Sequence, residues 1–231
     1  MVLGNGMIAT ALKSVDQPEV LYAASGLSNA KGADPAARAR EEGLLREQIQ
    51  LNKEKLFVYI SSYSIDEQQP ENNTPYLTHK LNMERLVKDN ADNYLIIRTS
   101  NVVGNSRQPG NLMNFIFQNL KDHQPFDIWT RTSRNLIDVQ DLALMAREAI
   151  NMGHRNKTLY VIHPCNISIL RIVQHFESLT GYEGDYKLVE KGAFYTADTG
   201  LSDTLFTRLG LNRDPDQYVR RLIEKYFLSK R

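Results

Sequence analysis

The chain has a single cysteine, Cys165, and no long hydrophobic run, and each shortage excludes a class of protein. One cysteine cannot form an internal disulfide, which is typical of proteins from a reducing compartment. No apolar stretch approaches the ~20 residues of a membrane span, and no basic segment precedes the apolar residues at the N-terminus. We therefore expect a cytoplasmic protein that does not cross a membrane.

A dominant charge is also missing, because 28 Lys and Arg residues and 27 Asp and Glu residues leave a net charge of +1. This balance gives no electrostatic reason to expect a nucleic acid partner. The five histidines show no H-x-x-x-H or similar ligand spacing, so no metal site is predicted. The 231 residues, of which 42% are hydrophobic, are enough for one large domain or for a domain with a smaller lobe.

Strand and helix signals alternate along the chain, which is typical of an α/β protein whose parallel sheet is covered by helices. Strands are expected over 19–24, 56–60, 94–98, 126–129 and 158–162. Helices are expected over 10–15, 38–52, from 76 onward, 112–120, 141–150, 168–179 and 215–230, with loops over 26–40 and 66–73. We place the larger domain at 1–150 and a smaller lobe at 151–231, and we expect the chain to cross between them more than once.

A glycine turn stands at the beginning of the chain. Gly4-Asn5-Gly6-Met7-Ile8-Ala9 follows the apolar Val2-Leu3 and precedes the first predicted helix. The glycines of a G-x-G-x-x-A turn let the backbone approach a pyrophosphate, which a helix N-terminus favours electrostatically. A purely structural glycine turn is the alternative interpretation of this motif taken alone.

Tyr76 and Lys80 are one helical turn apart, shortly after the strand that ends in Ser61-Ser62. Thr74 can cap the helix and Pro75 suits its first turn, so residues 76 and 80 share one face. An ammonium beside a phenol lowers the phenol's pKa, and a nearby serine can hydrogen-bond the oxygen of a reacting sugar or carbonyl. The pattern predicts a proton relay, whereas the pair alone also fits a surface tyrosine beside a solvated lysine.

In their order, these motifs resemble the extended short-chain dehydrogenase/reductases, and more narrowly the NAD-dependent nucleotide-sugar epimerase/dehydratase group. The resemblance spans nearly the whole chain and rests on Gly4-Asn5-Gly6-Met7-Ile8-Ala9, Tyr22-Ala23-Ala24, Phe57-Val58-Tyr59-Ile60-Ser61-Ser62, Tyr76-x-x-x-Lys80, Ile97-Arg98-Thr99-Ser100-Asn101-Val102-Val103-Gly104 and Arg134-Asn135-Leu136-Ile137-Asp138-Val139-x-Asp141-Leu142-Ala143. It implies a Rossmann-like, doubly wound parallel sheet that binds NAD or NADP, with a smaller C-terminal lobe for a nucleotide-sugar substrate.

By this resemblance, Ser62, Tyr76 and Lys80 are the catalytic triad. Tyr76 would exchange a proton with a sugar hydroxyl or keto oxygen while nicotinamide exchanges a hydride. Lys80 would lower the tyrosine pKa and hold the nicotinamide ribose, and Ser62 would hydrogen-bond the substrate oxygen. Ser61 is the alternative serine, unless its hydroxyl only satisfies backbone groups. The implied cofactor-binding residues are Gly4, Gly6, Met7, Ile8, Ala23, Ala24, Ser61, Tyr76 and Lys80.

Two further residues match substrate positions of the family. Asn101 matches the residue that contacts the nucleotide-sugar, and Arg134 matches the one that pairs with its diphosphate. A planar guanidinium suits this role because it can donate two parallel hydrogen bonds to phosphate oxygens. For Arg134 taken alone, a surface salt bridge is the alternative.

The chain also departs from the family pattern. Only Asp16-Gln17-Pro18 separates the first helix from the strand at 19–24, so one and a half β-α units are missing. The position of the usual ribose-binding residue then falls in the loop at 26–32, and NAD is not distinguished from NADP. We expect the first strand to form the sheet edge, open to solvent or to a second subunit of a homodimer. Asn135 and Asp138 stand where Asp and His are usual.

Two functions remain open. The first is an oxidoreductase or epimerase that acts on a nucleotide-diphosphate sugar, by family analogy in surface-polysaccharide synthesis. The presence of all three triad residue types favours it, and an open adenosine site favours a reductase with exchangeable cofactor over an epimerase that retains NAD. The second is a non-catalytic relative that binds a nucleotide or nucleotide-sugar, which the shortened N-terminal half favours.

Overall fold

The computed structural model describes residues 1–27, 34–66, 74–106, 110–194 and 198–228. The chain forms two compact units, the first made of 1–100 with 139–161 and the second of 101–138 with 162–231. It therefore passes from one unit to the other three times. This division differs from the boundary expected at residue 150, because residues 101–138 leave the first unit and residues 151–161 return to complete its sheet.

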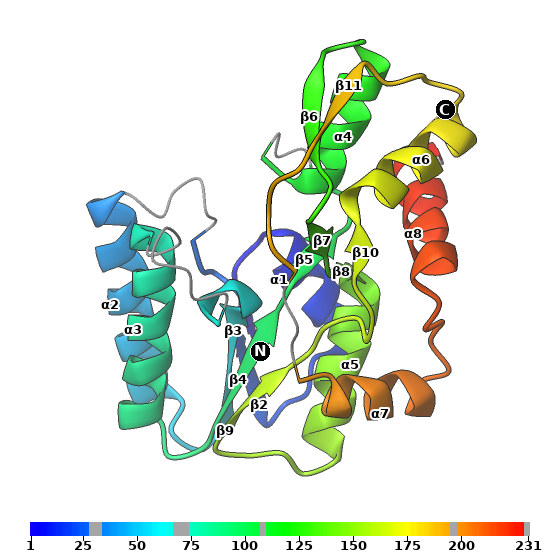
Figure 1. The fold of residues 1–231 in the computed structure, drawn as a ribbon. Helices are drawn as coiled ribbons and strands as arrows, with labels where there is room; N and C mark the ends of the chain where they lie inside the picture. The colour runs from blue at the N-terminus through cyan, green and yellow to red at the C-terminus, as the bar shows by residue number, and fades with distance from the viewer. Residues whose placement is uncertain (28–33, 67–73, 107–109, 195–197, 229–231) are drawn as a thin grey trace. The chain divides into compact units, whose positions relative to one another are not determined.

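A five-stranded parallel sheet forms the centre of the first unit, with the order β1-β2-β3-β4-β9 (Figure 1). Its strands are β1 (Val2–Leu3), β2 (Val20–Ala23), β3 (Leu56–Ser62), β4 (Tyr94–Thr99) and β9 (Lys157–Tyr160). The inner strands are apolar because both faces of such a sheet are covered by helices. The predicted parallel α/β arrangement is thus confirmed, and β1 lies at one edge as the short connection before β2 implies.

Two helical layers cover this sheet (Figure 1). The helical segments of the unit are α1 (Met7–Leu12), η1 (Lys13–Val15), α2 (Pro35–Leu51), η3 (Tyr63–Ile65), α3 (Pro75–Asn90) and α5 (Val139–Asn151). Helices α2 and α3 pack together on one face, and α1 and α5 pack together on the other. Because side chains alternate along a strand, Leu21, Phe57, Tyr59 and Ile96 share the hydrophobic core with α2 and α3.

Capping residues explain where the two helices of the α2/α3 layer begin. Asp34 accepts hydrogen bonds from the first turn of α2, and Thr74 does the same for α3, each followed by a proline. The predicted start of α3 is confirmed, whereas α2 begins at Pro35, three residues before the predicted 38. Of the predicted loops, residues 28–33 and 67–73 lie outside the described residues.

Helix α5 begins earlier than its sequence indicated. It starts at Val139, whereas the sequence led us to expect Asp141 to cap a helix that runs to residue 150, so Asp141 lies inside the first turn. A carboxylate in a first turn still interacts favourably with the helix dipole, so the charge suits either position. The error is therefore one of register within the first turn.

Within its described residues, the second unit contains three pairs of short strands together with several helices (Figure 1). The strands are β5 (Asn101–Val103) with β8 (Leu136–Asp138), β6 (Phe126–Trp129) with β11 (Tyr186–Val189), and β7 (Ser133–Arg134) with β10 (Ile167–Ser168). The helices are α4 (Leu112–Lys121), α6 (Ile169–Thr180), α7 (Gly200–Arg208), α8 (Pro215–Ile223) and the π-helical turn η5 (Glu224–Leu228).

Aromatic side chains from several of these elements form the core of the second unit. Phe176 of α6 contacts Phe117 of α4 and Phe227 of η5, with ring centroids 5.9 Å and 5.1 Å apart. The helix predicted to open at Ser168 is α6, which Ser168 caps and Gly181 ends with a φ of 74°. The helix predicted over 215–230 is instead α8 followed by η5, and its last residues lie outside the described part of the chain.

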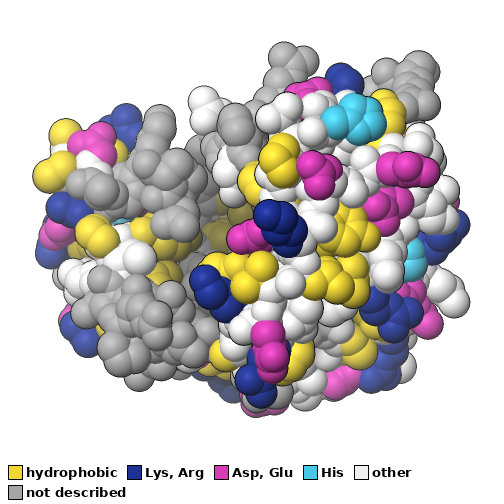
Figure 2. All heavy atoms as spheres, turned by 45° about the horizontal axis from the view of Figure 1, so that its top comes forward, with side chains coloured by type: hydrophobic (Ala, Val, Ile, Leu, Met, Phe, Trp, Pro, Cys, Tyr) yellow, Lys and Arg dark blue, Asp and Glu magenta, His cyan; other side chains and the backbone are white. Residues whose placement is uncertain are grey.

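The described surface carries charges of both signs. Acidic and basic side chains are intermixed on the face drawn in Figure 2, in keeping with a net charge of +1. Among the described helices, none combines the length and the apolar character needed to cross a lipid bilayer.

Tyr22 on β2 leads to a prediction about stability at high pH. Its side chain is fully buried, and its hydroxyl has no hydrogen-bond partner among the described residues. Burial, with help from Asp16, raises the pKa of Tyr22 to about 12. Because the pKa in the folded state lies above the value near 10 of the unfolded chain, the neutral phenol stabilises the fold by about 3 kcal/mol relative to the ionised one. This contribution is complete below about pH 10 and disappears as the pH rises toward 12. In Tyr22→Phe, the free energy of unfolding, measured in urea from pH 9 to 12, should fall less steeply with pH than in the wild-type protein. An unchanged pH dependence in Tyr22→Phe would contradict the assignment.

Candidate active site

The candidate catalytic residues lie at the carboxyl ends of the parallel strands in the sheet of the first unit. Strand β3 ends at Ser62 and helix α3 begins at Pro75, one residue before Tyr76. The Ser62 hydroxyl hydrogen-bonds the phenol of Tyr76, whose side chain is half-buried. Ser62 also accepts a hydrogen bond from the Ser64 amide at 3.3 Å, which holds its side chain at the start of η3. The structure therefore brings the predicted serine and tyrosine into contact.

Ser61 faces a different set of residues because neighbouring side chains of a strand point to opposite faces. Its buried hydroxyl donates to Glu84 Oε1 at 2.6 Å. Arg98 donates to both oxygens of the same carboxylate, at 2.9 Å and 2.7 Å. Of the two candidate serines, Ser62 is thus the one that contacts Tyr76, whereas Ser61 belongs to a buried ion-pair network.

Lys80 lies on the same face of α3 as Tyr76 but is directed toward other partners. Its buried ammonium donates to Tyr59 Oη at 2.9 Å and to Glu41 Oε1 at 3.3 Å. Burial lowers the pKa of Lys80, and the charge of Glu41 opposes this effect only in part. Lys80 is therefore held as one member of a buried cluster.

The expected lowering of the Tyr76 pKa is wrong for this arrangement. Burial raises the pKa of Tyr76 above its ordinary value, the hydrogen bond with Ser62 lowers it in part, and the charge of Glu41 raises it again. The main physical reason is the burial of the phenol; in addition, Glu41 accompanies Lys80, so the positive charge on this helix face has a nearby negative partner. Tyr76 is accordingly a protonated phenol at neutral pH.

Sequence reasoning missed Glu41, the acceptor at the centre of this cluster. Its side chain is 1% exposed, and its oxygens accept from Tyr59 Oη at 2.9 Å and from the Leu27 amide at 2.8 Å. His79 Nε2 lies 3.1 Å from the second oxygen. A signal was available, because Glu41 occupies the apolar stripe of α2 in which every fourth residue is buried: Ala37, Glu41, Leu45 and Ile49.

The glycine turn lies at the carboxyl ends of the parallel strands, as the triad residues do. Gly4 has a φ of 111°, and a Cβ on it would lie 2.7 Å from the Ala24 carbonyl oxygen, so only glycine fits. Gly6 caps α1 through its backbone, and a Cβ on it would meet no described atom within 4 Å. Ala23 pairs with Leu3, which places both alanines beside this turn.

This arrangement fits the diphosphate part of a dinucleotide. The first turn of a helix offers unpaired backbone N–H groups, and here Met7 and Ile8 open α1 directly after Gly6. The space above Gly6 is not filled by a side chain of the described residues. We therefore regard the predicted cofactor residues of the turn as sterically suited to a phosphate ligand.

Asn101 and Arg134, the predicted substrate residues, belong to the second unit. Asn101 opens β5 and is exposed, and its side-chain amide donates to the Asn135 carbonyl at 3.0 Å. Arg134 on β7 is half-buried and donates to the Ser133 carbonyl at 2.9 Å. The pairing of β5 with β8 therefore brings Asn101 next to the motif that contains Arg134.

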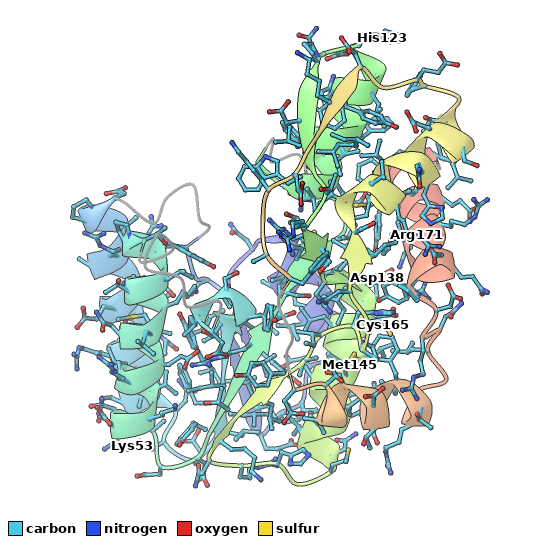
Figure 3. All side chains as sticks on the ribbon, in the orientation of Figure 1. Lys53, His123, Asp138, Met145, Cys165 and Arg171 are labelled. Carbon is cyan, nitrogen blue, oxygen red and sulfur yellow. The ribbon has the colours of Figure 1, made fainter. Side chains whose placement is uncertain are left out.

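The two family departures within this motif have structural roles. Asn135 is buried and exchanges hydrogen bonds with the His163 backbone, at 2.7 Å to its carbonyl and 3.0 Å from its amide. Asp138, labelled in Figure 3, is fully buried and accepts from Lys225 Nζ at 2.7 Å and from Tyr226 Oη at 2.8 Å. Asp138 therefore anchors the C-terminal η5 turn to the motif.

Comparisons with known proteins agree with this description. Residues 8–162 match the model of the NAD dependent epimerase/dehydratase family. Among curated proteins no match was found. Solved structures do match, and they include RMD from Pseudomonas aeruginosa complexed with NADPH, which has a TM-score of 0.74 and 16% identity over 97% of either chain.

Two further solved structures show the same fold. UDP-glucose-4-epimerase from Stenotrophomonas maltophila, with bound NAD and formylated UDP-arabinopyranose, has a TM-score of 0.70 and 20% identity over 96% of this chain and 79% of that one. dTDP-glucose 4,6-dehydratase from Bacillus anthracis, in complex with NAD, has a TM-score of 0.66 and 13% identity, covering 97% and 77%. The fold is therefore the Rossmann-like, doubly wound α/β fold of these proteins.

Proposed function

Because this chain belongs to the NAD dependent epimerase/dehydratase family, we propose that it is an NAD(P)-dependent oxidoreductase or epimerase of a nucleotide-diphosphate sugar. One observation carries the proposal: Ser62 hydrogen-bonds Tyr76 at the carboxyl ends of the parallel strands, where the glycine turn also lies. A serine and a tyrosine joined in this way are suited to proton transfer at a sugar oxygen. In the three solved structures described above, the bound dinucleotide is NAD or NADPH.

The sheet edge beside the glycine turn favours a reductase within this function, because β1 has no further strand beyond it among the described residues and a cofactor would have fewer contacts on its adenosine side. In the reductive direction Tyr76, hydrogen-bonded to Ser62, would give its phenolic proton to a keto oxygen. A nicotinamide held there would supply the hydride that the sugar carbon takes up while Tyr76 protonates the oxygen. Ser62 donates a hydrogen bond to the same oxygen and afterwards to the phenolate. We therefore favour a ketosugar reductase that exchanges its cofactor over an epimerase that retains it.

Lys80 and the glycine turn hold the cofactor in this proposal. Two of the three N–H donors of Lys80 are accepted by Tyr59 and Glu41, which leaves one for a ribose hydroxyl. Gly4 and Gly6 admit the diphosphate to the N-terminus of α1. In the second unit, Asn101 and Arg134 are the proposed contacts for the nucleotide-sugar, with the guanidinium of Arg134 on its diphosphate.

The cellular setting follows from the substrate class and from the free cysteine. Cys165 is exposed and unpaired with another cysteine, which fits the reducing cytoplasm. Nucleotide-diphosphate sugars are activated sugar donors, so by family analogy we assign the protein to surface-polysaccharide synthesis. The open edge of β1 is the proposed contact if two copies form a homodimer.

A non-catalytic sugar-nucleotide-binding protein is the second candidate, and a specific observation favours it. Strand β1 is at the sheet edge and pairs directly with β2, so the first unit has less structure beside the glycine turn than the family pattern provides. A cofactor would then have fewer contacts on its adenosine side.

A ligand titration separates the two candidates. The reductase should be stabilised by NADPH or NADH, by ~2.7 kcal/mol when the free ligand is at 100 times its Kd, and by one of a panel of nucleotide-sugars. Thermal unfolding with each ligand, together with nicotinamide fluorescence, provides the measurement. Stabilisation by a sugar nucleotide but by neither dinucleotide would select the binding protein and refute the enzyme.

A further inference from the structure

Glu41 connects four neighbours that come from three separate segments of the first unit. Its carboxylate accepts from the Leu27 amide, which follows β2, and from Tyr59 of β3. It also contacts His79 at 3.1 Å and Lys80 at 3.3 Å, both on α3. The carboxylate thus ties the backbone after β2 to the lysine of the candidate triad.

Folding alone does not explain a carboxylate at this position. Glu41 lies between Ala37 and Leu45 in the buried stripe of α2, where an apolar side chain would pack without desolvating a charge. Replacing a buried ion pair by apolar residues of similar volume is often neutral or stabilising. The position of Glu41 is therefore best explained by what it does to Lys80.

The cluster also confines the Lys80 ammonium to one place. Lys80 Nζ donates to Tyr59 Oη at 2.9 Å, and Tyr59 in turn donates to Glu41 Oε1 at 2.9 Å, which closes a ring of three groups. On another side stands Gly26, where a Cβ would overlap Lys80 Nζ and lie 3.0 Å from Glu41 Oε1. The ammonium is therefore fixed between β3, α2 and the backbone of Gly26.

We propose that Glu41 is a positioning residue that holds the Lys80 ammonium against Tyr59 and the Gly26 backbone, so that its remaining N–H donor is directed to the nicotinamide ribose. Glu41 acts through Lys80 and does not itself touch the substrate. This inference rests on the proposed function for the ribose, but the fixation of Lys80 by Glu41 is independent of it.

The charge of Lys80 is controlled by the same contact. The titratable groups that face the cluster are Glu41 and His79, Tyr59 and Tyr76, and Glu84 further along α3. Burial lowers the pKa of Lys80, and Glu41 is the largest influence in the opposite direction. Burial alone would raise the pKa of Glu41, yet Lys80, Leu27, Tyr59 and His79 together hold it below its ordinary value.

Two measurements on the full chain test the proposal, one of which needs no cofactor. Labelling lysine Cε with ¹³C gives the Lys80 titration by NMR, with the resonance assigned from its loss in Lys80→Met. Glu41→Gln should lower the Lys80 pKa further, and Glu41→Asp, which keeps the charge, should restore most of the difference. The matched control is Glu42→Gln, because Glu42 is the next residue of α2 and pairs on the surface with Arg46 at 2.9 Å.

The second measurement is the NADPH dissociation constant by fluorescence titration. This constant should rise about tenfold in Glu41→Gln, which is the effect expected when one hydrogen bond from Lys80 is weakened. It should stay unchanged in Glu42→Gln. An unshifted Lys80 titration in Glu41→Gln overturns the proposal. A shifted titration with no NADPH binding by the wild-type protein would refute the proposed function and leave the fixation of Lys80 standing.

Discussion

Tyr76→Phe is expected to lower kcat for ketosugar reduction by about 10²- to 10⁴-fold, the range usual for the loss of a general acid. The change removes only the phenolic oxygen that hydrogen-bonds Ser62. Binding of the dinucleotide should persist, because the glycine turn at Gly4 and Gly6 is unaffected. Single-turnover reduction of a bound ketosugar, followed by nicotinamide absorbance, measures the chemical step directly.

The comparison variants for Tyr76 come from the sheet of the same unit. Tyr22→Phe removes a buried hydroxyl that has no hydrogen-bond partner among the described residues, so it should leave kcat unchanged. Ser62→Ala should lower kcat more than Ser61→Ala, because only Ser62 contacts Tyr76, whereas Ser61 donates to Glu84. Full activity of Tyr76→Phe would show that proton transfer uses another group.

Lys80→Met is expected to lower the free energy of unfolding by about 3 to 5 kcal/mol, because it leaves the buried Glu41 carboxylate without its ammonium partner. The side chains of Lys80 and Glu41 are only 4% and 1% exposed, so water cannot replace the lost interaction. Urea unfolding followed by circular dichroism is the appropriate measurement. The single tryptophan, Trp129, belongs to the second unit, so circular dichroism, which follows the helices of both units, is used in place of tryptophan fluorescence.

A second substitution separates lost charge pairing from lost packing. In the double variant Lys80→Met with Glu41→Gln, the uncompensated charge is gone, and most of the stability should return. Lys88→Met is the matched control, since Lys88 is exposed in the last turn of the same helix. Equal losses in the single and double variants would mean that packing, and not the ion pair, dominates at this position.

Local sequence patterns predicted the frame of the candidate site well. The apolar run of β3, the Thr74-Pro75 start of α3 and the spacing of Tyr76 and Lys80 depend on a few consecutive residues. Strand alternation and helix periodicity follow from backbone geometry, so these features are readable without tertiary contacts. The short link before β2 likewise predicted that β1 forms the sheet edge.

Predictions failed where contacts between distant residues decide the outcome. The Tyr76 pKa is raised because burial and the charge of Glu41 act on it, and Glu41 lies on a different helix. The domain boundary moved because β9 pairs with β4 and returns residues 151–161 to the first unit. Both effects depend on contacts between residues that are far apart in the sequence.

The sequence by itself determined the family, the parallel α/β fold, and the presence of a serine, a tyrosine and a lysine in the order of a proton relay. Only the tertiary structure decided which serine meets Tyr76 and where the Lys80 ammonium is directed. The physical reason is that motif order and helical spacing are properties of the chain, whereas hydrogen-bond partners and burial depend on packing. Glu41 and Lys80 are 39 residues apart in sequence, and only the packing of α2 against α3 brings them together.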